Sequence, residues 1–228
     1  MPFDVNYSDR YKCLYIHVPK TGGCSVCDAL DTVTNHHTAL QCKRMWTKKF
    51  NDYWVFSIIR HPYDRLVSAW EYLRQGGCGN AYDLKLQRKL RQWEAADSDF
   101  DVFCQHALMV VSREWLHFLP QTYFLCDGNG VSLCDSIGTY ENMEESWKYI
   151  QEMTGCDTPL PHINPTPNRR PWWEYFTNKD TQRQVDCVYH SDFETWHYTR
   201  GRSSIGRASV WQTEGFVGSS PIDSTPIT

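Results

Sequence analysis

The stretch that decides the fold runs from residue 11 to residue 26 and has the sequence YKCLYIHVPKTGGCSV. Its β-branched and aromatic run from Leu14 to Val18 predicts a buried strand, which Pro19 ends. Gly22-Gly23 predict a tight turn, and residues 24–30 predict the start of a helix. Such a helix start presents unpaired N–H groups to one point, to which Lys20 adds a positive charge. The stretch therefore predicts a site for a phosphate or sulfate; the alternative is an ordinary connection between strand and helix.

A second strand, turn and helix follow in residues 53–77. The run YWVFSII (53–59) is almost continuously apolar. That pattern is typical of a strand covered on both faces, so we expect a central parallel sheet. Pro62 ends the strand, Asp64 is the expected helix cap, and the helix is expected to run to Arg74, before Gly76-Gly77. Arg60 thus stands where an anion-binding side chain again lies between a strand and a helix.

These two stretches resemble the cofactor motifs of sulfotransferases that use 3′-phosphoadenosine 5′-phosphosulfate (PAPS). PKTGGCS (19–25) is similar to the family's 5′-phosphosulfate loop, usually PKTGGTS. It differs from a Walker A loop, in which Lys and Ser/Thr follow the last glycine. RHPYDRLVSAW (60–70) resembles the family's 3′-phosphate motif. The resemblance, to carbohydrate or membrane-type sulfotransferases and their bacterial or viral relatives, implies PAPS contacts from Lys20, Thr21, Gly22, Gly23, Cys24, Ser25, Arg60 and Ser68. Cys24 departs from the usual Thr and lacks its hydroxyl.

The resemblance implies in-line transfer of a sulfuryl group from PAPS to a hydroxyl, with a carbohydrate as the expected acceptor and PAP as the product. Positioning and electrostatics do most of the catalysis in such transfers, and Lys20 is expected to stabilise charge on the bridging and leaving phosphate oxygens. The acceptor hydroxyl needs a general base. We expect His36, because the segment HHTA (36–39) resembles the family's His-x-Thr-Ala. His37 takes this role if the register shifts by one, and His61 is expected to pack or cap.

The resemblance covers about residues 11–198 and implies an α/β fold. We expect a three-layer, P-loop NTPase-like domain with a central, mainly parallel sheet. The expected domain organisation is a sulfotransferase domain at 1–198 and a disordered C-terminal tail at 199–228, because the tail has no apolar period.

The rest of the chain gives weaker predictions. Helices are expected at 38–48, 100–108, 143–153 and 178–189, and a β-hairpin with arms at 122–126 and 131–137. The basic segment 78–98 predicts a solvated helix face or, alternatively, an acceptor-binding flap. Tyr140 and Glu141 lie in a segment that the family places behind the nucleotide site, which implies structural supports. The proline-rich loop 159–171 is expected either to contact the cofactor or to be an exposed linker.

Composition argues against several other classes. A net charge of −4 argues against general nucleic-acid binding. No apolar run approaches the ~20 residues of a membrane span. The first residues lack the apolar core of a signal peptide, so we expect a cytoplasmic protein. The 10 cysteines form no zinc-binding pattern, and no metal is expected. Two alternatives to a sulfotransferase remain: a nucleotide or small-molecule kinase, and a non-catalytic nucleotide-binding protein.

Overall fold

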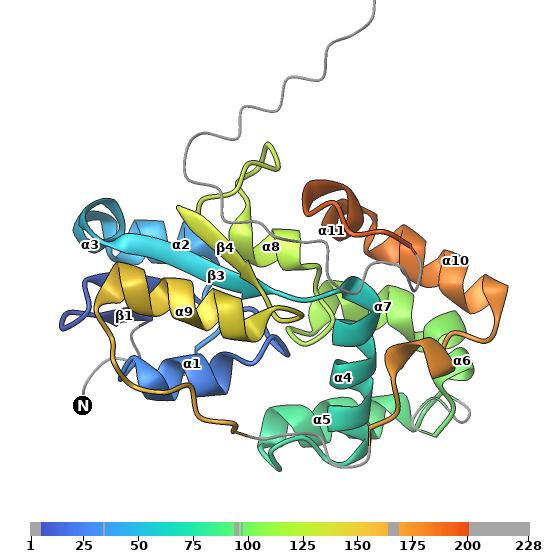
Figure 1. Ribbon diagram of the computed structural model, residues 1–228. Coiled ribbons are helices and arrows are strands. Elements are labelled where there is room, and N and C mark those ends of the chain that lie inside the picture. Colours follow the sequence, from blue (N-terminus) through green and yellow to red (C-terminus); the bar gives the residue numbers. More distant parts are fainter. Residues whose placement is uncertain (1–5, 34, 94–95, 97, 164–168, 201–228) are drawn as a thin grey trace, which may run out of the picture.

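The computed structural model describes residues 6–33, 35–93, 96, 98–163 and 169–200. Within these residues a four-stranded sheet has the order β1–β2–β3–β4 (Figure 1). β1 (Tyr7–Ser8) is antiparallel to β2 (Cys13–Ile16), and β3 (Trp54–Ile59) is parallel to both β2 and β4 (Ser136–Thr139). The fold is therefore mixed α/β with a mostly parallel sheet, as predicted. Of the tail expected at 199–228, residues 201–228 lie outside the described residues.

Helices make up most of the remaining described chain. They are α1 (Gly23–Ala29), α2 (Ala39–Met45), α3 (Thr47–Asp52), α4 (Pro62–Arg74), α5 (Ala81–Leu90), α6 (Phe100–Val102), a π-helical turn (Phe103–Ala107), α7 (Leu108–Glu114), α8 (Gln121–Leu125), α9 (Met143–Thr154), a 3₁₀ turn (Trp172–Glu174), α10 (Lys179–Val188) and α11 (His190–Thr195). Local caps set several of their ends. Thr38 and Gln41 form a reciprocal capping box at the start of α2, and the side chain of Asn178 caps α10. Gly155 ends α9 with a φ of 69°.

The side chains of the central strands point alternately into two apolar cores, one on each face of the sheet. Tyr15 and Phe56 pack with α1 and α9, in a cluster that includes Trp147. Leu14 and Val55 point to the opposite face, into a larger cluster with residues of α2, α4, α7 and α8. Burial on both faces explains the almost continuously apolar run at 53–59 and confirms the predicted central strand.

The predicted β-hairpin is wrong. Residues 121–125 form helix α8, because the carboxylate of Asp192 accepts the amide N–H groups of Gln121 (2.8 Å) and Thr122 (2.9 Å) at its start. In the described part of the chain, one isolated antiparallel bridge between Cys126 and Ser132 is what remains of the hairpin. β4 then joins the sheet parallel to β3. A carboxylate distant in sequence thus supplies the helix cap that the local sequence lacks.

Other helix boundaries also differ from the prediction. The helix expected at 38–48 is two helices, α2 and α3, which meet at Trp46. The segment expected to be one helix at 100–108 contains the π-helical turn between α6 and α7. Asp64 does not cap α4. The ring of His61 accepts the N–H of Tyr63 instead, because the Asp64 carboxylate is bound by Arg60.

Candidate active site

The turn between β2 and α1 needs glycine at two positions. Gly22 has a φ of 82°, in the left-handed region. A Cβ on Gly23 would overlap the imidazole ring of His17, which is buried just after β2. The hydroxyl of Thr21 donates to the carbonyl of Val18 (2.9 Å) across the turn. Among the described residues, the amide N–H groups of Gly22 and Gly23 have no acceptor, so both are available to an anion.

Lys20 opens this turn and is itself in the left-handed region, with a φ of 71°. Its ammonium Nζ lies 3.8 Å from the centroid of the Tyr72 ring. Burial, and next the charge of Arg60, lower the pKa of Lys20 to about 8, while Cys24 and Asp83 act in the opposite direction. A bound anion would stabilise this ammonium, because it would offset both effects that lower the pKa.

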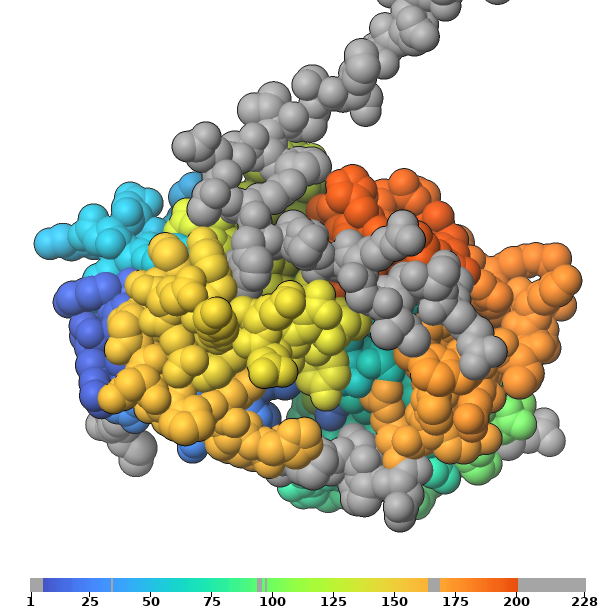
Figure 2. Space-filling view, in the orientation of Figure 1, coloured from blue at the N-terminus to red at the C-terminus, as the bar shows by residue number. Residues whose placement is uncertain are grey.

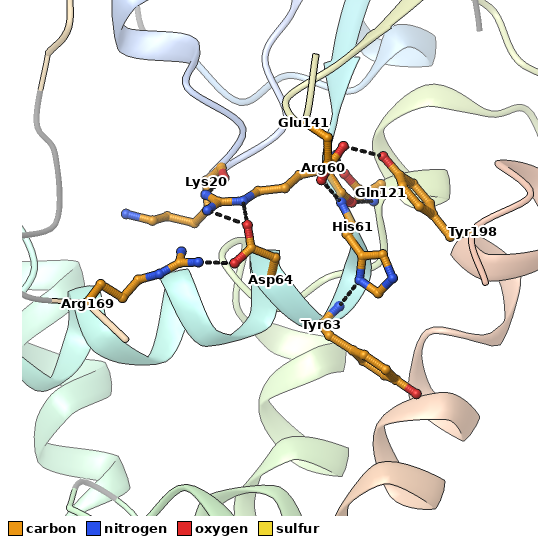
Figure 3. A network of polar contacts seen from close by, with 9 residues as sticks. All are labelled: Lys20, Arg60, His61, Tyr63, Asp64, Gln121, Glu141, Arg169 and Tyr198. Carbon is orange, nitrogen blue, oxygen red and sulfur yellow. Dashed lines mark hydrogen bonds and ion pairs between the residues drawn. The ribbon is translucent and has the colours of Figure 1, made fainter. Parts of the chain in front are cut away.

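Arg60 lies at the end of β3, next to the turn. Its Nε donates to Oδ2 of Asp64 (2.7 Å), and its Nη1 donates to the carbonyl of Lys20 (3.0 Å). The guanidinium lies over the Tyr140 ring, 3.9 Å from the centroid. Arg169, from the segment before α10, pairs with the other oxygen of Asp64 (Figure 3). Two guanidiniums thus share one carboxylate, which leaves a net positive charge beside the turn.

The backbone at Arg60 is held in place by side chains from distant segments. Gln121 accepts the Arg60 N–H (2.9 Å) and donates to the Arg60 carbonyl (2.8 Å). Glu141 accepts the His61 N–H (2.6 Å) and the Tyr198 hydroxyl (3.0 Å). The contacts of Tyr140 and Glu141 fit the supporting roles expected for them, and His61 caps and packs as predicted. These bonds explain why the Arg60 side chain has a defined direction.

Three histidines gather around Lys20. Nδ1 of His36 lies 3.1 Å from the carbonyl of His17. Because a carbonyl can only accept, Nδ1 carries the proton and Nε2 is left as the basic nitrogen of His36. The His36 ring centroid is 4.4 Å from that of His17 and 6.4 Å from that of His117. Burial lowers the pKa of His36, so its ring is neutral near pH 7.

His37 has different neighbours, although it is adjacent in sequence. Its ring packs edge-on against Trp46, with the centroids 5.9 Å apart, and its Nε2 is hydrogen-bonded to the side chain of Asn35 (2.9 Å). The structure therefore places His36, and not His37, in the histidine group beside Lys20.

The remaining predicted residues lie close to these groups. Cys24 is half-buried on the first turn of α1, and the hydroxyl of Ser25 accepts the N–H of Ile163 (3.2 Å). Ser68 is buried on α4, one turn after Asp64 and on the same side of the helix. In the space-filling view the surface is hollowed between the segment around α9 and the segment before α10, and atoms of the β3–α4 region show at its base (Figure 2).

Sequence reasoning missed His17 and His117, and it gave Arg169 only as one of several polar candidates in the loop 159–171. His17 gave a signal, because it is a polar residue in an otherwise apolar run. His117 lies in a segment without a clear pattern, and nothing local marks it. Arg169 was one of several polar side chains in the late loop, and its pairing with Asp64 depends on the fold alone.

All ten cysteines are free thiols, including Cys24 and Cys27. Within the described residues, no group of three or more His, Cys, Asp or Glu side chains could hold a metal ion. The helices described are all too short or too polar to cross a bilayer.

Comparison with known proteins decides the family. The profile of the sulfotransferase family matches residues 3–199. The chain belongs to the sulfotransferase family. It is a PAPS-dependent sulfotransferase, an enzyme whose sulfuryl donor is PAPS, and the kinase and non-catalytic alternatives are set aside. Searches of curated proteins and of solved structures find no match to this sulfotransferase.

Proposed function

We propose that this sulfotransferase transfers a sulfuryl group from PAPS to a hydroxyl of a carbohydrate, with His36 as the general base. The observation that carries the proposal is the hydrogen bond from His36 Nδ1 to the His17 carbonyl. It leaves Nε2 free to take the proton of an acceptor hydroxyl, and burial keeps the ring in the neutral form that a base requires. The likeness of the motifs to those of carbohydrate sulfotransferases supports the acceptor class.

The cationic groups beside the turn fit PAPS, which carries negative charge at both ends of its ribose. Lys20 and the free N–H groups of the turn, among them those of Gly22 and Gly23, are assigned to the 5′-phosphosulfate; the N–H of Ser25 already donates to the Gly22 carbonyl (3.1 Å). Arg60 and Ser68 are assigned to the 3′-phosphate, where a guanidinium can donate two hydrogen bonds. Arg169 shares the Asp64 carboxylate with Arg60 and so adds a cation to the same end.

Each of these residues has a separate task. PAPS, when bound, supplies the sulfuryl group and a phosphate leaving group. The ammonium of Lys20 stabilises charge that develops on the bridging and leaving oxygens, and His36 removes the proton of the attacking hydroxyl. The main-chain carbonyl of His17 holds His36, and the ring of His17 lies against Gly23, so one residue positions both the base and the turn.

We also infer that residues 1–198 form one sulfotransferase domain of the three-layer, P-loop NTPase-like type. Two features support this: helices cover both faces of the mostly parallel sheet, and a glycine turn joins β2 to α1. The family match over residues 3–199 supports the same boundaries.

The experiment that tests the proposal compares the wild type with His36→Ala and the matched control His37→Ala. A panel of polysaccharides and small glycosides is incubated with radiolabelled PAPS, and PAP binding is measured by calorimetry. His36→Ala should lose about 10²- to 10⁴-fold in transfer rate and keep its affinity for PAP. His37→Ala should resemble the wild type. Full activity of His36→Ala would refute the base assignment, and a wild type that does not bind PAP would refute the whole proposal.

A further inference from the structure

A row of three rings extends from Lys20 away from the turn. Tyr72 lies under the Lys20 ammonium, the His117 ring is 5.2 Å from the Tyr72 ring, and the Tyr82 ring is 6.3 Å from the His117 ring. Tyr82 is 38% exposed, and Tyr72 and His117 are half-buried. His117 also faces His36 from the other side. The row thus starts at the proposed reaction centre and ends at the surface.

His117 is held in this row by its neighbours' rings. Its Nδ1 is buried and has no hydrogen-bond partner among the described residues. The same does not hold for its Nε2, which is the nitrogen open to a ligand. Burial lowers the pKa of His117 to about 3, so the ring is neutral at the pH of the cell. A neutral imidazole with one accessible nitrogen can donate to, or accept from, a hydroxyl.

Apart from Lys20, which the proposed function assigns to PAPS, the charged groups described near the ring row include Asp83 and Arg65. Asp83 accepts hydrogen bonds from the Tyr72 hydroxyl (2.7 Å) and from the Cys78 N–H (3.0 Å). Arg65 is buried and donates to the Pro19 carbonyl (2.9 Å). What the row offers to a ligand is therefore two aromatic faces and a neutral imidazole. The apolar C–H face of a sugar ring packs well on such a surface, whereas a carboxylate or sulfate would be repelled by Asp83 and would compete with PAPS for Lys20.

We propose that Tyr72, His117 and Tyr82 form the acceptor subsite of this enzyme, and that the subsite takes an uncharged sugar ring that carries the reactive hydroxyl. The inference rests on the proposed function, because it places the acceptor next to His36. It goes further by giving the acceptor ring a location and a charge class.

A matched pair of acceptors tests the charge class. 4-Nitrophenyl β-glucopyranoside and 4-nitrophenyl β-glucuronide differ only at C6, where the second has a carboxylate. With radiolabelled PAPS, the wild type should sulfate the glucopyranoside with a kcat/KM at least about tenfold higher than that of the glucuronide, since an unpaired charge is costly to bury. Preference for the glucuronide, or transfer to neither glycoside, would overturn the subsite.

Variants test the location. His117→Ala should raise the KM for the glucopyranoside about tenfold and leave the affinity for PAP unchanged, because a hydrogen bond and a ring contact are lost on the acceptor side only. His117→Gln, whose amide reaches the position of Nε2, should recover part of this loss. The exposed His106 provides the matched control, and His106→Ala should behave like the wild type.

A second position guards against misfolding of the His117 variants. Tyr82→Ser should raise the same KM, and Tyr82→Phe, which keeps the ring, should recover most of this loss. An unchanged KM in both His117→Ala and Tyr82→Ser would overturn the subsite. Loss of PAP binding by the wild type would instead overturn the proposed function, so the two failures are distinguishable.

Discussion

Gly23→Ala offers a direct test of how the turn and the histidines are linked. Gly23 begins α1 with an ordinary backbone conformation, so alanine at this position causes no backbone strain. Its higher helix propensity should stabilise the helix by up to about 1 kcal/mol. The new Cβ, however, would overlap the ring of His17. That ring is 4% exposed, and it stacks on Tyr15 with the centroids 5.6 Å apart, so it has little room to move.

The free-energy cost of this overlap should exceed the stabilisation from helix propensity. Overpacking of a buried site costs typically about 1–3 kcal/mol, so the net loss in the free energy of unfolding should be about 1–2 kcal/mol. Transfer should fall as well, because displacement of His17 moves the carbonyl that holds His36. Gly128→Ala is the matched control: its Cβ meets nothing within 4 Å, and its φ is not in the left-handed region. Its stability should stay within about 0.5 kcal/mol of the wild type.

Urea unfolding of the two single variants, His17→Ala and the double variant measures the coupling. In the His17→Ala background the obstacle is gone, so Gly23→Ala should become neutral or stabilising, with a coupling energy of about 1–3 kcal/mol. The denaturation midpoints should shift at an unchanged m-value. If Gly23→Ala is as stable as Gly128→Ala, or if His17→Ala does not relieve its effect, the packing of His17 against the turn is refuted.

Two further predictions concern charge. The pH profile of kcat/KM should be bell-shaped. At low pH activity falls as His36 takes up a proton, and this limb lies below the ordinary histidine pKa of about 6.5 because burial lowers the pKa of His36. At high pH activity falls as Lys20 loses its proton, near its pKa of about 8. Lys20→Arg should remove the fall of kcat/KM at high pH. If this fall is unchanged in Lys20→Arg, another group causes it. Arg60→Gln should weaken PAP binding about 10- to 100-fold and leave AMP binding unchanged, because AMP lacks the 3′-phosphate. The exposed Arg113 gives the control Arg113→Gln, and equal losses for PAP and AMP would place Arg60 elsewhere on the nucleotide.

Features that depend on neighbouring residues could be predicted from the sequence. The apolar run at 53–59 indicated a strand buried on both faces, and Thr38, Asn178 and Gly155 marked helix ends. The order of proline, lysine and glycines after β2 indicated the turn, and the family match confirmed the sulfotransferase that its resemblance implied. Such signals arise within a few residues, because caps, turns and burial periodicity are local.

Features that depend on contacts between distant residues could not be predicted from the sequence. The helix at 121–125 replaced a predicted strand because Asp192 lies 71 residues from Gln121 in sequence and caps it. Arg169 meets Asp64 across 105 residues.

The sequence by itself determined the sheet's central strands, the glycine turn and the cationic residues at the strand ends, since each is encoded by adjacent side chains. Only the tertiary structure decided that His36 rather than His37 lies beside Lys20, that His17 packs under Gly23, and that His117 faces His36. The physical reason is that packing of the two cores, rather than any local pattern, brings these rings together at the carboxyl end of β2.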